Sequence, residues 1–187
     1  MNVLVTGGAA SGKSAYAENL LLSLAGEGER IYIACMRNDS SAAKKRIARH
    51  RALREGKGFI TLEKPVDLGT LAKEVSGCSI LIEGAGMLLS NEMFPAASNR
   101  VPEAAGEWES SAGERAFSGI HALMRAAANA VIVTDEVFSD GRVYDSLTAS
   151  YIRALGALNC RLAALCDRVV EVVYSYPVEI SSRGGSS

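Results

Sequence analysis

Four residues near the start of the chain have the types and the spacing of a loop that binds phosphate. The pattern G-x-x-x-x-G-K-[ST] is matched by Gly7, Gly12, Lys13 and Ser14. In such a loop, glycines let successive backbone N–H groups point at one anion, and the helix that follows adds its dipole. We expect Lys13 to reach the β- and γ-phosphates and the Ser14 hydroxyl to bind Mg²⁺. The pattern therefore predicts a nucleoside triphosphate site; a tight turn that happens to contain Gly-Lys-Ser is the alternative.

The residues around this loop predict the two elements that must hold it. Branched apolar residues at 2–6 are typical of a strand, and apolar residues recur with helical spacing from Ala15 to Leu24. A strand that leads through glycines into a helix is the setting that a phosphate loop requires. The whole predicted loop consists of Gly7, Gly8, Ala9, Ala10, Ser11, Gly12, Lys13 and Ser14.

An acid that holds Mg²⁺ usually stands at the end of a second apolar strand. Four acids end apolar runs in this way: Glu63, Glu83, Asp135 and Glu136. We favour Glu83 for a metal-linked role, because the run CSILIE is the most completely apolar and a charge at its end needs a function. Glu63, which closes GFITLE, is a weaker case. The alternative for each is an acid that ends a strand and faces water.

A strongly basic segment, KKRIARHRALREGK at 44–57, contains His50. Like charges nearby disfavour the imidazolium form, so we expect a neutral imidazole, which is a nucleophile, beside arginines that hold a triphosphate. A solvated helix face and a nucleic-acid patch are the alternatives. The second is disfavoured because no aromatic residues interleave for base stacking, and because the net charge of the chain is −1. The other histidine, His121, is predicted to be an ordinary helix residue.

The elements that carry these residues alternate between strand and helix. Strands are predicted at 2–6, 30–35, 58–63, 78–83, 130–136 and 168–174, with an edge strand at 178–180. Helices are predicted after the phosphate loop and at 41–55, 66–75, 86–94, 115–129 and 146–166. This alternation predicts an α/β fold, with one domain at 1–180, a mainly parallel sheet, helices on both faces and ligands at the carboxyl ends of the strands. Residues 95–114 are predicted to form a long surface loop, and 181–187 a disordered tail.

The composition of the chain excludes several classes of protein. Its 187 residues are 48% hydrophobic, which suits a packed domain rather than a disordered chain. No apolar run approaches the roughly 20 residues of a membrane span, and no signal peptide is expected before the first strand. Four cysteines without a C-x-x-C pair and two distant histidines make a zinc site unexpected and indicate a cytoplasmic protein.

Several segments, in order along nearly the whole chain, match those of one known family. They are LVTGGAASGKS at 4–14, YIA at 32–34, RIARHR at 46–51, TLEKP at 61–65, ILIE at 80–83, SN at 90–91, VTDEV at 133–137 and ALGALNCRLAALCDRVVEVV at 154–173. The most specific is R-I-x-x-H-R between a phosphate loop and a T-x-E strand. By these segments the chain resembles the adenosylcobinamide kinase / adenosylcobinamide-phosphate guanylyltransferase family of cobalamin biosynthesis.

This resemblance implies a RecA-like P-loop NTPase fold, a homotrimer and two activities on a corrinoid substrate. One activity phosphorylates the hydroxyl of the cobinamide side arm with ATP or GTP. The other transfers GMP from GTP, through a histidine, to the new phosphate. His50 is then the guanylylated catalytic residue, and Lys13 and Ser14 serve the phosphates and Mg²⁺. Glu63 contacts the guanine nucleotide, and Glu83 lies by the nucleotide or the metal. The remaining residues of the implied nucleotide-binding set are Ala34, Cys35, Met36 and Arg51.

The chain also departs from the usual pattern of this family. Ala10 stands where the family loop has an arginine, and Gly84 follows Glu83 in place of a cysteine. The residues FSDGRVYD at 138–145 replace a glycine-rich segment. Two other functions therefore stay open: a P-loop kinase of another small alcohol, with His50 only a phosphate-side residue, and a nucleotide-binding module without guanylyl transfer.

Overall fold

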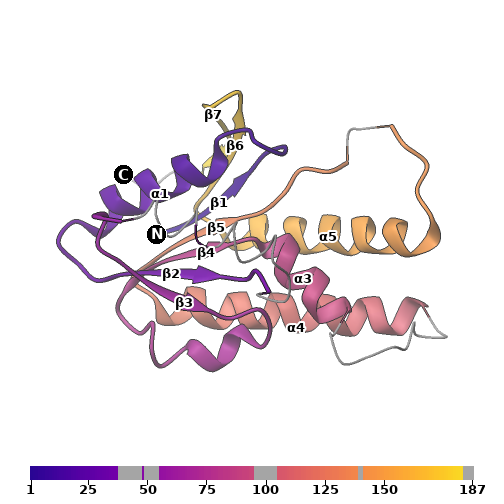
Figure 1. Cartoon of the computed structure of the whole chain (residues 1–187), viewed down its shortest axis with the longest axis horizontal. Helices are drawn as coiled ribbons and strands as arrows, with labels where there is room; N and C mark the ends of the chain where they lie inside the picture. Colours follow the sequence, from indigo (N-terminus) through magenta and orange to yellow (C-terminus); the bar gives the residue numbers. More distant parts are fainter. Residues whose placement is uncertain (38–47, 49–54, 95–104, 139–140, 183–187) are drawn as a thin grey trace.

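The structure, a computed structural model, describes residues 1–37, 48, 55–94, 105–138 and 141–182, and of residues 105–110 only the backbone (Figure 1). Its strands are β1 (Asn2–Thr6), β2 (Arg30–Ala34), β3 (Phe59–Glu63), β4 (Ser79–Glu83), β5 (Asn129–Val133), β6 (Arg168–Val173) and β7 (Tyr176–Ser182). Its helices are α1 (Lys13–Ala25), α3 (Ala85–Met93), α4 (Ala105–Ala126) and α5 (Ser146–Leu165), with a short 3-10 helix η1 (Leu68–Leu71).

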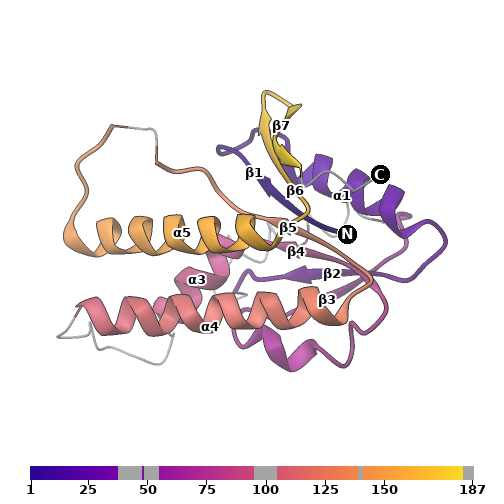
Figure 2. The same ribbon diagram turned by 180° about the vertical axis from the view of Figure 1, so that it is seen from behind.

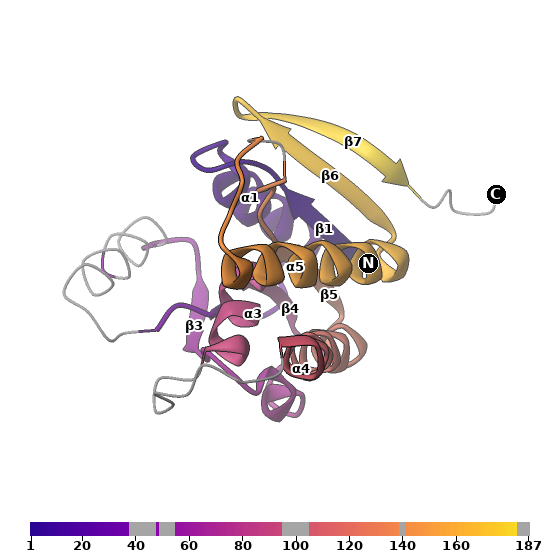
Figure 3. The same cartoon turned by 90° about the vertical axis from the view of Figure 1, so that its right-hand side faces the viewer.

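The strands form one sheet in the order β3-β2-β4-β5-β1-β6-β7. Neighbouring strands are parallel except β6 and β7, which form an antiparallel hairpin at one edge, opposite β3 at the other edge (Figure 3). The register aligns the carboxyl ends of the strands. Glu83 on β4 lies beside Ala34 on β2 and Val133 on β5. Ala34 in turn lies beside Glu63 on β3. The predicted acids of β3 and β4 therefore end at the same level of the sheet.

Helices cover both faces of this sheet (Figures 1 and 2). Successive side chains of a strand point to opposite faces, and β1 shows the consequence. Val3 and Val5 pack with Leu21 of α1, whereas Leu4 belongs to the core beneath α3, α4 and α5. The strands in the middle of the sheet are buried on both faces, which explains their nearly continuous apolar sequences. The predicted α/β class, with a mainly parallel sheet and helices on both faces, is confirmed.

Two predicted elements are wrong. The helix predicted at 66–75 is only the single turn η1, because Asp67 has a positive φ of 53° and the segment runs close against α4, with Gly69 facing Gly119. The loop predicted at 95–114 is helical from Ala105, as the first part of α4. Among its described side chains, the buried one is Ala112, which is small and gives little apolar signal in the sequence.

The other predicted elements are found, with shifted ends. β5 ends at Val133 instead of 136, and β7 reaches Ser182, two residues into the predicted tail. The predicted helix at 41–55 lies almost entirely outside the described residues, as do 95–104 and 183–187. Among the described residues, no helix is long and apolar enough to cross a membrane.

Candidate active site

The predicted phosphate loop joins β1 to α1, and close contacts explain why two of its positions, Gly7 and Gly12, have no side chain. A Cβ on Gly7 would lie 2.6 Å from the Val172 carbonyl oxygen, and a Cβ on Gly12 would lie 2.7 Å from Ser175 Oγ. Gly12 also has a φ of 93°, which favours glycine. Within the described residues, no side chain caps the start of α1. The first N–H groups of this helix are therefore available to an anion, as a phosphate site requires.

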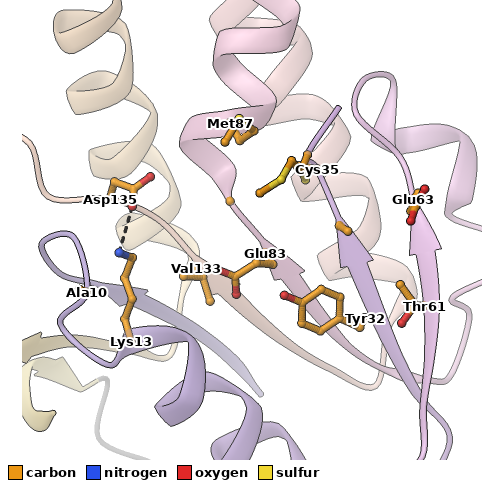
Figure 4. A pocket seen from close by; sticks show the side chains of 13 residues that line it. Ala10, Lys13, Tyr32, Cys35, Thr61, Glu63, Glu83, Met87, Val133 and Asp135 are labelled. Atoms are coloured by element: carbon orange, nitrogen blue, oxygen red, sulfur yellow. Dashed lines mark ion pairs between the residues drawn. The ribbon is translucent and has the colours of Figure 1, made fainter. Parts of the chain in front are cut away.

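Lys13 and Ser14 each contact a carboxylate that comes from another strand end. Lys13 Nζ lies 3.0 Å from Asp135 Oδ1 and donates to the Gly8 carbonyl oxygen at 3.1 Å (Figure 4). Ser14 Oγ donates to Glu83 Oε1 at 2.9 Å. Figure 4 shows Glu83 between the Lys13 side and the strands β2 and β3. A lysine, a hydroxyl and two carboxylates thus gather at the end of the sheet where a parallel α/β fold binds ligands.

The environment of the Glu83 carboxylate suits the binding of a cation. Burial raises its pKa to about 7, although the Ser14 hydrogen bond and the Lys13 charge oppose that rise. Its second oxygen, Oε2, is buried and has no hydrogen-bond partner within the described part of the chain. Mg²⁺ prefers oxygen ligands and is commonly held by one or two carboxylates plus substrate phosphates. The Ser14 and Glu83 oxygens fit such an ion.

No group of three or more His, Cys, Asp or Glu side chains in the described residues could hold a metal ion. The pair formed by Ser14 and Glu83 would thus need the phosphates of a nucleotide to complete the coordination of Mg²⁺.

A pocket of about 350 Å³ extends from Lys13 to Glu63 across the strand ends (Figure 4). It is lined by Ala10, Lys13, Tyr32, Ala34, Cys35, Met36, Thr61, Glu63, Glu83, Gly84, Met87, Val133 and Asp135. Burial and the charge of Glu83 raise the pKa of the Cys35 thiol, which therefore stays protonated and serves as an apolar wall. The pocket has residues of the predicted phosphate loop at one end and the Glu63 carboxylate at the other.

The structure brings most of the predicted site residues together. Seven of them line the pocket: Ala10, Lys13, Ala34, Cys35, Met36, Glu63 and Glu83. The rest of the predicted loop, Gly7, Gly8, Ala9, Ser11, Gly12 and Ser14, stands next to this group between β1 and the start of α1. His50 and Arg51 lie outside the described residues, so their roles stay predictions. His121 lies on α4 with its ring 5.7 Å from that of Phe117, as an ordinary helix residue would.

Asp135 is one of the strand-end acids that the sequence offers for Mg²⁺, although Glu83 is favoured over it there. The segment after β5 runs alongside the start of the predicted phosphate loop. Thr134 N donates to the Val5 carbonyl oxygen, and Glu136 N donates to the Gly7 carbonyl oxygen. This path places the Asp135 carboxylate at Lys13. Burial and the Asp135 charge also raise the pKa of Tyr151, on α5, to about 12. Only the pairing of β1 with β5, which the sequence does not state, could have revealed this arrangement.

Comparison with known proteins yields one family over nearly the whole chain. A family model described as cobinamide kinase / cobinamide phosphate guanyltransferase matches residues 3–180. The chain is 36% identical over 191 aligned residues to the bifunctional adenosylcobalamin biosynthesis protein CobU of Salmonella typhimurium. It is 34% identical to the protein of the same name from Escherichia coli K12. Each alignment covers 96% of this chain and 99% of the relative.

Proposed function

Because the chain belongs to the cobinamide kinase / cobinamide phosphate guanyltransferase family, it is a transferase, and we propose that its pocket is the nucleotide site for both reactions. The substrates in this proposal are ATP or GTP and the corrinoid adenosylcobinamide. The product of the first reaction, adenosylcobinamide phosphate, is the acceptor of the second. The observation that carries the proposal is the Ser14–Glu83 hydrogen bond of 2.9 Å beside Lys13, at one end of the pocket.

In the kinase reaction, the phosphate loop and Lys13 bind the β- and γ-phosphates. Ser14 and Glu83 are the residues that would hold Mg²⁺, which neutralises charge on the transferring phosphoryl group when it is bound. Lys13 exchanges its ion pair with Asp135 for the phosphates, since the anion carries more charge than one carboxylate. The hydroxyl oxygen of the acceptor bonds to the γ-phosphorus, and the bond from the γ-phosphorus to the β,γ-bridging oxygen breaks. The nucleoside diphosphate leaves with that oxygen, and the hydroxyl proton passes to water.

In the guanylyl transfer, we propose His50 as the nucleophile. A nitrogen of its imidazole bonds to the α-phosphorus of GTP, and pyrophosphate leaves with the bridging oxygen. A phosphate oxygen of the acceptor then bonds to the same phosphorus, and the P–N bond breaks. Nucleophilic catalysis of this kind divides one difficult transfer into two easier steps. Family membership and the basic character of the segment around His50 support this role.

Intact-mass measurement after incubation with GTP and Mg²⁺ tests the histidine step. Wild-type protein should gain the mass of one GMP, through a bond that is labile in acid and stable in base. His50→Ala should lose this adduct and keep phosphoryl transfer, whereas His121→Ala, the matched control, should change neither. A wild type that phosphorylates an alcohol but never gains the mass would favour a kinase alone. An adduct that survives in His50→Ala would reject the residue.

The same proposal includes a homotrimer in the cytoplasm. The support in the structure is β7, an edge strand on which every residue is exposed, including Tyr176, Val178 and Ile180. Long exposed apolar edge strands are generally covered, because they would otherwise pair with other chains. Light scattering on the purified protein measures the mass of the assembly, and a monomer at micromolar concentration would contradict this part of the proposal.

A further inference from the structure

Asn91, on α3, is a buried polar residue that touches the ends of two strands. Its side chain is among the few polar ones that are buried in the described residues, at 5% exposure. Nδ2 donates to the Cys35 carbonyl oxygen at 2.8 Å and to the Pro65 carbonyl oxygen at 2.9 Å. Both partners are carbonyl oxygens, which only accept, so the amide nitrogen must face them. One side chain therefore joins the segments that leave β2 and β3.

These two segments form the wall of the pocket that lies opposite the phosphate loop. The last regular contacts between the strand ends are Cys35 N to the Glu83 carbonyl oxygen, at 3.3 Å, and Lys64 N to that of Ala34, at 3.0 Å. Beyond them, among the described hydrogen bonds, Asn91 provides a link between the segment after β2 and the segment after β3. The wall contains Cys35, Met36 and Glu63, which line the pocket.

A second contact holds the same segment to the same helix. Arg37, two residues after Cys35, donates from Nη2 to the Asn91 carbonyl oxygen at 2.8 Å and from Nη1 to that of Phe94 at 2.7 Å. The helix α3 begins directly after Glu83 and Gly84. This helix is therefore one rigid element that connects Glu83 to the wall that contains Cys35, Met36 and Glu63.

We infer that Asn91 is a positioning residue for the nucleoside part of the nucleotide. This inference rests on the proposed function, which puts the phosphates at Lys13. The base and ribose must then lie toward Cys35, Met36 and Glu63, in the direction in which the pocket extends. Asn91 sets the distance of this wall from the phosphate loop, and Arg37 supports it from outside. Asn91 does not line the pocket itself, so it acts on the nucleotide through the wall.

The amide of Asn91 is specifically required, because both bonds need a donor. In Asn91→Asp, a carboxylate oxygen would face two carbonyl oxygens and repel both segments, although the shape of the side chain would hardly change. Leaving buried acceptors without their donor is costly. We expect the affinity for GTP to fall roughly 5- to 100-fold, while the phosphate end of the pocket stays intact.

Titration calorimetry with GTP and with inorganic tripolyphosphate, each with Mg²⁺, separates the two ends of the pocket. Asn91→Asp should weaken GTP binding and leave tripolyphosphate binding within about threefold. The matched control is Asn129→Asp. Asn129 Nδ2 bonds to the Leu24 carbonyl oxygen and to Ser79 Oγ at the opposite end of the sheet, so this variant should change neither affinity.

A second pair of variants covers the case in which Asn91→Asp does not fold. Arg37→Met should also weaken GTP binding, but less than Asn91→Asp does. Arg30→Met, which removes contacts to carbonyl oxygens at the start of β2, should leave the affinity for GTP unchanged. Unchanged GTP affinity in Asn91→Asp would overturn the inference, as would an equal loss for tripolyphosphate. If Asn91→Asp does not fold, unchanged GTP affinity in Arg37→Met would overturn it. Wild-type protein that binds neither ligand would instead overturn the proposed function.

Discussion

Replacing Glu83 with glutamine should make the nucleotide-free protein more stable at the cost of its activity. The carboxylate ends the buried strand β4, and burial raises its pKa from 4.5 to about 7. The buried charge therefore destabilises the nucleotide-free protein, and a bound cation would offset this effect. Glutamine has nearly the same shape, and its side-chain carbonyl oxygen can accept the hydrogen bond from the Ser14 hydroxyl, as Glu83 Oε1 does.

The size and the sign of this effect follow from the two pKa values. Between about pH 4.5 and pH 7, the folded protein holds a proton that the unfolded chain has lost. Stability therefore falls as the pH rises through this window and is constant above it. One pKa unit corresponds to about 1.4 kcal/mol, so the charged form lowers the free energy of unfolding by about 3 kcal/mol above pH 7. Glu83→Gln should recover that amount, or about 6–12 °C in the melting temperature of a chain of this size.

Thermal unfolding in EDTA, at pH 5 and at pH 8, measures the difference between Glu83→Gln and wild type. The gain should be below about 1 kcal/mol at pH 5 and reach about 3 kcal/mol at pH 8. The matched control is Glu63→Gln, which removes a charge from the exposed end of the same pocket and should change stability little at either pH. A gain that does not depend on pH, or a loss at pH 8, would refute the electrostatic reasoning.

The same variant should lose activity while it gains stability. Glu83→Gln should weaken Mg²⁺-dependent phosphoryl transfer more than the binding of metal-free nucleotide, because the amide is a poorer ligand for a hard cation. Calorimetry in EDTA and a steady-state kinase assay measure the two quantities. Equal loss of both would argue against a metal-linked role.

Three further variants test other parts of the structure. Lys13→Ala should abolish phosphoryl and guanylyl transfer with an unchanged circular dichroism spectrum, and near wild-type transfer would contradict the phosphate-loop assignment. Gly12→Ala should lower the free energy of unfolding by about 1–3 kcal/mol, since its Cβ meets the β6–β7 turn at positive φ; Gly8→Ala, with open space around its Cβ, is the control in urea unfolding. Lys57→Met should destabilise by about 1–3 kcal/mol, because it leaves the buried Glu18 without its partner at 2.6 Å. A second change, Glu18→Gln, should restore part of that loss, and additive losses in the double variant would exclude the pairing.

The elements predicted correctly are those whose evidence is local in the sequence. Around the predicted phosphate loop, a strand signal, glycines and a helix start stand within about fifteen residues, and the strand and the helix are found as β1 and α1. Segments such as ILIE and VIV are apolar on both faces, which indicates a strand in the middle of a parallel sheet. Glu83 is singled out for the same reason, as a charge at the end of such a strand, and its metal-linked role stays a prediction.

The errors arose where small residues carry the packing. In the first part of α4, Ala112 is buried, and alanine gives little signal in an apolar period. In η1, Gly69 and Gly119 allow two segments to approach so closely that a regular helix after Asp67 is interrupted. In the sequence, these alanine and glycine residues give no clear signal for or against a helix. Their role in packing follows only from the tertiary contacts.

The two ends of the pocket differ in the same way. The end beside Lys13 carries the predicted phosphate motif, whose residues are adjacent in the sequence. The opposite wall depends on hydrogen bonds from Asn91 to Cys35 and Pro65, which lie 56 and 26 positions away along the chain. An asparagine among the apolar residues of the segment MLLSNEMF is compatible with a buried polar group that needs partners. Its partners follow only from the register of β2 and β3, which no local pattern states. A local motif can therefore predict a phosphate site, whereas the wall opposite it depends on the packing of α3 on the strand ends.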